Sequence, residues 1–186
     1  MIDYNPKEYQ GPIRLADVPT AWRGIEKIIV SIIQDFGIGT KDALEFGVDY
    51  GFSTSALANF FEAVIGVDTF DGDVHAGPRD HLLEQASNAL KDFENIYLEK
   101  SSYQDYIQDN DMHFNLIHID IIHTYEDTYA CGKWAVEHAD VVIFHDTESF
   151  ADVRRAVEDL SKEFGREFYN YKPHHGLGII SKNKIK

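Results

Sequence analysis

One stretch, residues 43–68, constrains the fold of this chain more than any other. An apolar run ends at residues 45–47, a turn continues to Gly51, and a helix-like segment leads to a second apolar run that stops at Asp68. This order of strand, glycine turn, helix, strand and acid is the layout of a βαβ unit that holds a nucleoside. The alternative is a tight turn whose glycines serve geometry alone.

The glycine spacing of this turn argues against a dinucleotide. A dinucleotide fingerprint reads Gly-x-Gly-x-x-Gly, whereas Asp49 stands here in the place of the middle glycine. A carboxylate at that position would repel a pyrophosphate, but it would not repel a sulfonium cation or an amino group. Asp68, at the tip of the second strand, can accept hydrogen bonds from both hydroxyls of a ribose. We therefore expect a nucleoside site without phosphates, formed by Glu45, Gly47, Asp49, Gly51, Ser53 and Asp68.

The composition limits the partners of this chain. Its 186 residues carry a formal net charge of −15, which argues against a nucleic acid or an anionic membrane surface as partner. Cys131 is the single cysteine, which excludes an intrachain disulfide and suits a reducing compartment. No signal peptide is visible at the N-terminus, and the longest apolar runs are about half of what a membrane span requires. We expect one cytoplasmic domain, with a homodimer left open.

Strand-like and helix-like segments alternate after an irregular arm of residues 1–18. A leading helix within residues 19–39 is expected over 21–36, with Thr20 as its N-cap. Strands are expected over 42–47, 63–68, 95–99, 114–119, 139–144, 166–171 and 177–181, and helices over 53–62, 79–92, 102–108, 126–137 and 149–164. Such alternation predicts a mostly parallel sheet with helices on both faces, a three-layer Rossmann-like core over residues 40–186.

The last two expected strands break the parallel pattern. Only residues 172–176 separate them, and this gap is too short for a crossover helix, so the pair is expected to be antiparallel. The sequence therefore predicts a seven-stranded α/β sheet with an antiparallel last strand. In such sheets ligands bind beyond the carboxyl ends of the strands, near the point where the strand order reverses.

Acids and histidines follow the fourth and fifth expected strands. Asp120 and His123 come after the fourth strand, and His145 and Asp146 come at the end of the fifth. Neighbouring strands would bring these side chains close together. Two carboxylates with an imidazole suit a divalent cation, and they equally suit acid–base work on a substrate hydroxyl. The alternative is that Asp146 caps the helix expected from residue 149.

Three further features have a structural explanation at least as good as a functional one. Ser102 lies in a turn against which a base could rest, but it can equally cap a helix. His174 and His175 point to opposite sides of an extended chain and cannot easily share an ion, which favours an exposed turn. Trp22 and Trp134 fit helix faces that pack on the sheet.

The motifs EFGVDYGFST, VIGVDTFDGD, LIHIDIIHTYED, VIFHDT, ADVRRAVEDL and HGLGII together resemble class I S-adenosylmethionine-dependent methyltransferases. The resemblance extends over residues 40–181. It is greatest to the small-molecule subgroup of the macrolide, cephamycin and aminocoumarin pathways, which has an acid-rich and often magnesium-dependent site. It implies S-adenosyl-L-methionine as cofactor, with Gly47 and Gly51 along its methionine part and Asp68 on its ribose.

The same resemblance implies a divalent cation held by Asp120, His145 and Asp146. Magnesium is expected first, and the mixed oxygen and nitrogen donors also suit manganese, iron or zinc. We expect catalysis to depend on Asp120, His123 and His145, with Asp120 as a candidate base. Asp120 and Ser102 are expected to complete the cofactor site.

The chain departs from the subgroup at Ile121 and Ile122, where a glycine and an acid are common. This change keeps open a catalytically inactive binding module. A metal-dependent hydrolase that uses Asp120, His123, His145 and Asp146 is a further alternative. A nicotinamide dehydrogenase is disfavoured by Asp49. We expect O-methylation of a small polar molecule, with residues 1–18 or 70–79 as the segments that could cover the substrate.

Overall fold

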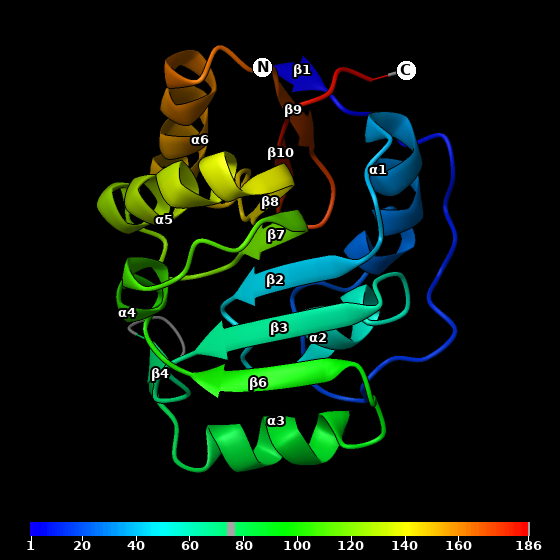
Figure 1. Ribbon diagram of the computed structural model, residues 1–186, viewed down its shortest axis with the longest axis vertical. Coiled ribbons are helices and arrows are strands. Elements are labelled where there is room, and N and C mark those ends of the chain that lie inside the picture. The colour runs from blue at the N-terminus through cyan, green and yellow to red at the C-terminus, as the bar shows by residue number, and fades with distance from the viewer. Residues whose placement is uncertain (74–76, 186) are drawn as a thin grey trace.

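The computed structural model describes residues 1–73 and 77–185. Within them, eight strands form one mixed sheet in the order β1-β9-β10-β8-β7-β2-β3-β6 (Figure 1). These strands are β1 (Ile2–Asp3), β2 (Asp42–Phe46), β3 (Ala63–Asp68), β6 (Ile96–Lys100), β7 (Phe114–Ile119), β8 (Ala139–His145), β9 (Phe168–Tyr171) and β10 (Leu177–Ser181). A separate pair joins β4 (Gly72–Asp73) to β5 (Gly77–Pro78). The helices are η1 (Ile25–Lys27), α1 (Ile29–Phe36), α2 (Phe52–Leu57), α3 (Leu82–Leu90), α4 (Tyr103–Gln108), α5 (Tyr125–His138) and α6 (Ala151–Glu163).

The central strands present alternate residues to two helical layers. On β2, for example, Ala43 belongs to one apolar core and Leu44 to the other. The first core packs the sheet against η1, α1 and α2, and the second packs it against α4, α5 and α6. The two cores explain why the central strands are nearly continuous apolar runs, since both of their faces are covered.

The order of the strands reverses between β2 and β7. From β2 the chain moves outward through β3 to β6, then returns to β7 on the other side of β2 and continues to β8. β2 pairs in parallel with both β3 and β7, so their carboxyl ends meet at one edge of the sheet. The predicted hairpin is confirmed, because β10 pairs antiparallel with β9 and with β8. The predicted α/β fold is therefore confirmed, with β1 as a short additional edge strand.

The leading helix is shorter than predicted. It begins at Ile25 as a 3₁₀ turn, and regular α-helix follows only from α1 onward. Thr20 is not a helix cap: its hydroxyl accepts a hydrogen bond from the N–H of Trp22 over 2.9 Å, which is a local turn that competes with helix formation. Gly24, with φ 109°, then sets a non-helical conformation just before Ile25.

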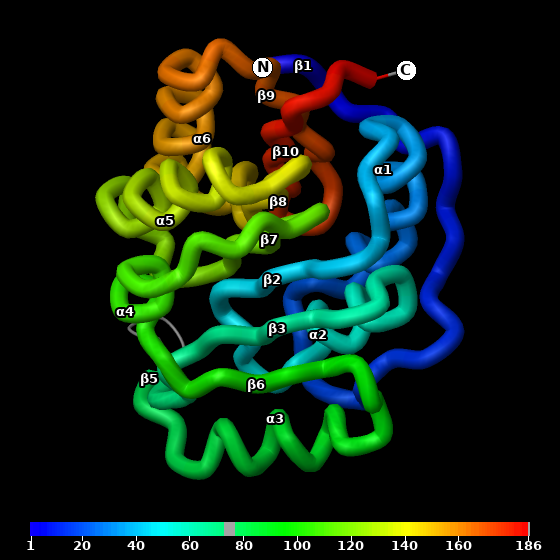
Figure 2. Tube along the Cα trace, in the orientation of Figure 1, coloured from blue at the N-terminus to red at the C-terminus, as the bar shows by residue number. Residues whose placement is uncertain are grey.

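The N-terminal arm, residues 1–18, runs along one side of the molecule (Figure 2). β1 pairs with β9 at the sheet edge, and the hydroxyl of Tyr4 donates to Asp35 on α1 over 2.9 Å. Further along the arm, the N–H of Ala16 donates to the hydroxyl of Ser55 on α2 over 3.0 Å. None of the arm residues lines the cavity described below. The arm therefore lies beside the body of the protein rather than over the site.

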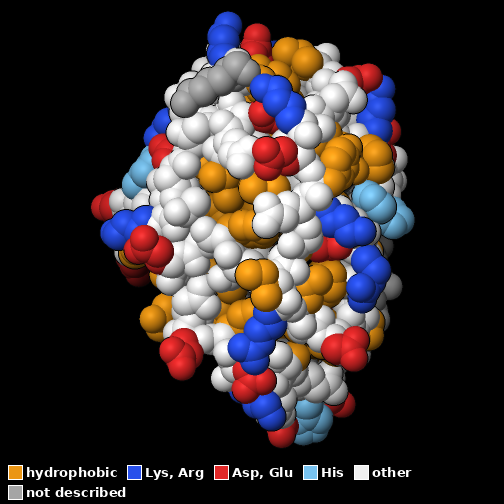
Figure 3. Space-filling view, turned by 90° about the vertical axis from the view of Figure 1, so that its right-hand side faces the viewer, with side chains coloured by type: hydrophobic (Ala, Val, Ile, Leu, Met, Phe, Trp, Pro, Cys, Tyr) orange, Lys and Arg blue, Asp and Glu red, His pale blue; other side chains and the backbone are white. Residues whose placement is uncertain are grey.

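The face on the side of the arm carries charges of both signs. Hydrophobic side chains appear there as small areas among Lys, Arg, Asp and Glu (Figure 3). In the parts of the chain that the structure describes, no helix is both long enough and apolar enough to cross a membrane.

Candidate active site

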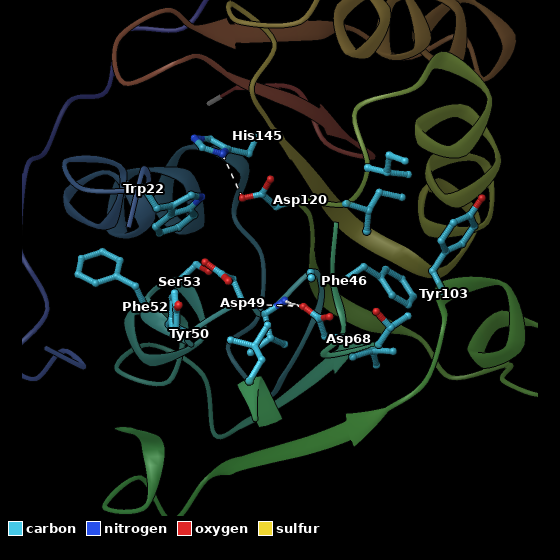
Figure 4. A pocket seen from close by; sticks show the side chains of 18 of the residues that line it. Trp22, Phe46, Asp49, Tyr50, Phe52, Ser53, Asp68, Tyr103, Asp120 and His145 are labelled. Carbon is cyan, nitrogen blue, oxygen red and sulfur yellow. Dashed lines mark hydrogen bonds and ion pairs between the residues drawn. The ribbon is translucent and has the colours of Figure 1, made fainter. Parts of the chain in front are cut away.

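A cavity of about 590 Å³ opens at the carboxyl ends of β2, β3, β7 and β8, and this volume suits a small-molecule ligand. Figure 4 shows that Asp68 and Tyr103 lie at one end, that Asp120 and His145 lie at the other, and that Asp49 lies between them. We refer to these as the Asp68 end and the Asp120 end. The other expected site residues on the wall are Gly47, Ser53, Ser102, His123 and Asp146.

The two glycines of the turn are required by different neighbours. Gly47 has φ 90°, and a Cβ there would lie 1.8 Å from the carbonyl oxygen of Asp120. Gly51 has φ 92°, and a Cβ there would meet the side chain of Leu90 at 2.6 Å. Both φ values favour glycine. Gly47 borders the cavity, whereas Gly51 lies behind it and makes room for α3.

The side chain of Asp68 organises the turn. Its Oδ2 accepts hydrogen bonds from the N–H groups of Val48 (2.7 Å) and Asp49 (3.0 Å). Its Oδ1 accepts from the N–H of Phe70 (2.7 Å). A carboxylate offers about four acceptor positions, so Asp68 can hold the turn and still accept a hydrogen bond from a ligand hydroxyl.

The negative charge of Asp49 is balanced by a neighbouring side chain. Its carboxylate forms an ion pair with Arg79, whose guanidinium lies 4.8 Å from the centre of the Tyr50 ring. Burial raises the pKa of Asp49, and the positive charge of Arg79 opposes this shift. Arg79 belongs to the segment 70–79 expected to cover the site, of which residues 74–76 lie outside the described residues. The pairing weakens the repulsion of phosphates that the sequence suggested.

Ser102 caps a helix, as one of its two interpretations predicted. Its hydroxyl accepts a hydrogen bond from the N–H of Asp105 (3.1 Å) and donates to the carboxylate of Asp105 (2.7 Å), at the start of α4. The neighbouring Tyr103 donates its hydroxyl to Asp127 on α5 over 2.8 Å. Both side chains border the cavity, so this wall of the Asp68 end is held by helix termini.

The groups expected after β7 and β8 converge at the Asp120 end. Within the described residues, Asp120, His123 and Asp146 offer ligand atoms that all lie within 4.8 Å of one another. His123 Nε2 is 2.8 Å from Asp146 Oδ2 and 3.6 Å from Asp120 Oδ1. His145 Nδ1 is 3.1 Å from Asp120 Oδ2 and 3.6 Å from Asp146 Oδ2. The triad that could share an ion thus contains His123, whereas His145 had been expected there.

Asp146 owes its position to an unusual backbone conformation. Its φ is 65°, in the left-handed region that Asp tolerates better than most residues. The alternative in which Asp146 caps the next helix is wrong, because α6 begins after Phe150 without a side-chain cap. Phe150 instead stacks on His123, with ring centroids 4.0 Å apart. The turn after β8 therefore fixes one carboxylate and one imidazole of the cluster.

Mutual attraction shifts the pKa values within this cluster. Burial alone would raise the pKa of Asp120, but the neighbouring imidazoles of His145 and His123 lower it well below its usual range. Burial disfavours the imidazolium form of His123, yet hydrogen bonding to Asp120 and Asp146 raises its pKa to about 9. The pKa of His145 is raised despite its burial, mainly by the charge of Asp120. Without a bound cation the cluster therefore favours protonated imidazoles beside carboxylates.

A buried polar chain that the sequence did not reveal lies beneath the cavity. His118 Nδ1 is 2.8 Å from Glu45 Oε1, and the indole N–H of Trp22 donates to His118 Nε2 over 3.2 Å. The other carboxyl oxygen of Glu45 accepts a hydrogen bond from the hydroxyl of Thr54. Glu45 is fully buried and lies under the cavity rather than on its wall. Trp22, expected to pack only on the sheet, lines the cavity.

The turn between β9 and β10 packs against the site from outside. His174 and His175 are exposed, which confirms the exposed turn predicted for them. Nδ1 of His175 lies 3.0 Å from the hydroxyl of Ser149, in the turn that follows Asp146. The ring of His174 covers Gly24, where a Cβ would meet it at 2.3 Å. The hairpin thus braces both the Asp146 turn and the segment that carries Trp22.

The fold and the cavity together define a class of protein. A Rossmann-like sheet with an antiparallel strand between β8 and β9, and a cavity where the strand order reverses, is the architecture of class I methyltransferases. A family model described as a methyltransferase domain matches residues 44–147, more than half of the chain. The chain belongs to this methyltransferase family. None of the curated proteins compared with the chain matches it.

Solved structures share the fold at low sequence identity. A proposed caffeoyl-CoA O-methyltransferase from Staphylococcus aureus is 18% identical, with a TM-score of 0.68 over 89% of this chain and 86% of that one. An O-methyltransferase from Bacillus cereus, in complex with S-adenosylhomocysteine, is 14% identical, with a TM-score of 0.62 over 91% and 84%. A proposed rRNA methylase from Clostridium thermocellum is 14% identical, with a TM-score of 0.63 over 91% and 99%.

Proposed function

We propose that this protein transfers a methyl group from S-adenosyl-L-methionine to a hydroxyl of a small polar molecule. One observation carries the proposal: a single cavity joins a glycine turn and a strand-end acid to a cluster of carboxylates and imidazoles. The complex of the Bacillus cereus relative with S-adenosylhomocysteine supports the same cofactor for this chain.

The cofactor would lie with its ribose at Asp68, where an acceptor position remains for a hydroxyl. Its base would rest against Ser102 and Tyr103, which border that end of the cavity. Its methionine part would then follow the turn at Gly47. This orientation would point the methyl group toward Asp120, which lies at the opposite end of the cavity (Figure 4).

Methyl transfer is an in-line displacement at carbon. The C–O bond forms as the C–S bond breaks, and the sulfur leaves with the electron pair as a neutral thioether. The protein must therefore hold the acceptor oxygen on the axis and remove its proton. Asp120 is placed to accept that proton, because it borders the cavity and a quarter of its side chain is exposed. His145 Nδ1, 3.1 Å away, orients the Asp120 carboxylate and keeps it ionised.

The same cluster fits a divalent cation. Two carboxylates and one imidazole, from Asp120, Asp146 and His123, give a mixed oxygen and nitrogen donor set that suits magnesium or manganese, with iron or zinc as alternatives. A cation held there would lower the pKa of an acceptor hydroxyl and fix its direction. Ile121 and Ile122 border this end, so the protein itself supplies no further acid at those positions.

The charge of the cavity bears on the acceptor. Asp49, Asp68, Asp120 and Asp146 line it, and Arg79 is already paired with Asp49. Together with a net charge of −15, this favours a neutral or cationic small molecule over a nucleic acid. The fold alone does not decide this point, because a proposed rRNA methylase shares it. We also propose a cytoplasmic location, on the basis of the single cysteine.

Calorimetry with S-adenosyl-L-methionine and S-adenosylhomocysteine, each with and without Mg²⁺, tests the proposal. We expect both nucleosides to bind, and we expect Mg²⁺ to bind in the presence of either one. Release of S-adenosylhomocysteine on addition of hydroxylated acceptors would follow. Absence of binding at millimolar nucleoside would contradict the proposal, and NADH binding would indicate a dehydrogenase. Metal binding without any nucleoside binding would indicate a hydrolase.

A further inference from the structure

The buried chain beneath the cavity has one consistent arrangement of protons. An indole N–H can only donate, so Nε2 of His118 must accept, and the imidazole carries its proton on Nδ1. That proton is donated to Glu45, whose second oxygen accepts from Thr54. Glu45 and His118 are also paired residues on the adjacent strands β2 and β7. The chain therefore links Trp22 directly to the centre of the sheet.

The indole of Trp22 forms part of the cavity wall at the Asp120 end. Figure 4 shows it on the same side as His145 and Asp120, across the cavity from Asp68 and Tyr103. Its side chain is 2% exposed, and its ring centre lies 5.1 Å from that of His118. It is carried by the irregular segment before η1, so no helix fixes its direction.

Packing alone does not explain this arrangement. A phenylalanine could fill an apolar site with no polar partner, whereas a buried imidazole and a buried carboxyl group each cost free energy unless they are hydrogen bonded. The polar chain additionally fixes the orientation of the indole ring, because the indole N–H must meet Nε2 of His118. The two groups that set this direction, Glu45 and His118, do not line the cavity.

We propose that Trp22 is the wall that limits the size of the group next to the reacting atoms, and that His118, held by Glu45, is the residue that positions it. The inference rests on the proposed function for the ligand, since it places the transferable methyl group of S-adenosyl-L-methionine at the Asp120 end. It assigns specificity to a residue outside the carboxylate–imidazole cluster.

Analogues of the cofactor test the wall without an identified acceptor. The affinities for S-adenosyl-L-methionine and for its S-ethyl analogue are measured by calorimetry. In the wild type the additional methylene should meet Trp22 and weaken binding by about tenfold, and Trp22→Ala should remove most of this difference. Tyr103→Ala, at the opposite end, is the matched control, which should weaken both ligands equally. An unchanged affinity ratio in Trp22→Ala would overturn the inference.

Fluorescence tests the positioning role separately. Trp22 and Trp134 are the two tryptophans, so Trp22 is the single reporter in a Trp134→Phe background. His118→Phe should shift its emission to the red and increase quenching by acrylamide, whereas His118→Gln, which retains an acceptor, should stay near the wild type. Equal spectra in folded His118→Phe and wild type would overturn the positioning role.

The two proposals fail in distinguishable ways. If the wild type binds neither S-adenosyl-L-methionine nor its S-ethyl analogue, the proposed function is wrong. The fluorescence measurement then still decides whether His118 positions Trp22. If the wild type binds S-adenosyl-L-methionine and its S-ethyl analogue equally well, the proposed function stands, and the proposal that Trp22 limits the size of the transferred group is refuted. If His118→Phe does not fold, as judged by circular dichroism, Trp22→Phe replaces it, because this variant keeps an apolar ring and removes the N–H that donates to His118. A Trp22→Phe variant with the same affinity ratio as the wild type would overturn the inference.

Discussion

The two ends of the cavity are built in different ways. At the Asp68 end, residues 47–51 form a turn whose shape comes from backbone N–H groups bonded to one carboxylate. At the Asp120 end, titratable side chains from β7, β8 and the turns after them meet only because the strands are neighbours. A site made of backbone holds one ligand in one way. A site made of side chains can change its chemistry by single substitutions, which suits a fold that serves many acceptors.

The largest effect is expected at Gly47, where the glycine turn approaches the backbone of Asp120. Gly47→Ala would place a Cβ 1.8 Å from the carbonyl oxygen of Asp120, at φ 90°, and should destabilise the fold by about 3 kcal/mol and abolish cofactor binding. Urea unfolding and calorimetry measure both. Gly165→Ala is the matched control, because its φ is also positive but a Cβ there meets nothing. It should cost only about 1 kcal/mol. Equal losses in both variants would contradict this steric argument.

The second largest effect should be confined to the Asp120 end. Asp120→Asn keeps the shape of the side chain but removes its charge, so turnover should fall by about a hundredfold or more. The affinity for S-adenosylhomocysteine should remain nearly unchanged, since Asp120 lies across the cavity from Asp68. Asp111→Asn, at an exposed acid, should leave both unchanged. Full activity of Asp120→Asn on an identified acceptor would remove the proposed distinction between the two ends.

A smaller effect should be confined to the other end. Asp68→Ala removes the acceptor of three backbone N–H groups and of the expected ribose hydroxyl. Cofactor binding should weaken by roughly 1.5–3 kcal/mol, while turnover at saturating cofactor should stay near that of the wild type. Calorimetry and steady-state rates separate the two quantities. Asp71→Ala, at an exposed ion pair with Lys100, is the control. A turnover defect as large as that of Asp120→Asn would show that the ends are not separable.

The smallest effect concerns the helix that borders the Asp68 end. Ser102→Ala removes the cap of α4 and should lower the free energy of unfolding by about 1 kcal/mol. Because the hydroxyl is already engaged with Asp105, cofactor affinity should change little. Urea denaturation and calorimetry with S-adenosylhomocysteine check this, with Ser101→Ala as control. A large loss of affinity with unchanged stability would instead favour direct contact of Ser102 with the base.

The sequence predicted the glycine turn and the strand-end acid of the Asp68 end because these features are local, whereas their binding of a nucleoside stays a prediction. Gly47, Gly51 and Asp68 follow one another along a single βαβ unit, and their spacing alone defines the turn. The terminal hairpin was predictable for a similar reason, since the gap at residues 172–176 excludes a crossover. These features depend on chain geometry over short distances.

The Asp120 end was only partly predictable, because pairing between strands decides it. Residue types identified Asp120, His123, His145 and Asp146, but only the left-handed turn at Asp146 shows that His123 completes the triad that could share an ion. Whether that triad holds an ion stays a prediction. No local pattern in the sequence links His118 to Glu45 and Trp22. The sequence does place a His on an apolar central strand. Its position opposite Glu45 becomes visible only when the register of the parallel pair is known.

The pairing of β1 with β9 has a consequence for how the protein becomes competent during synthesis. Residues 2–3 join residues 169–170, and Lys172 reaches Asp3 over 2.8 Å. Synthesis proceeds from the N-terminus, and contacts this distant along the chain form only after a long loop has closed. The arm therefore stays without its partner strand until nearly all of the described chain has left the ribosome. The turn between β9 and β10, which contacts Gly24 and Ser149 beside the cavity, is made equally late.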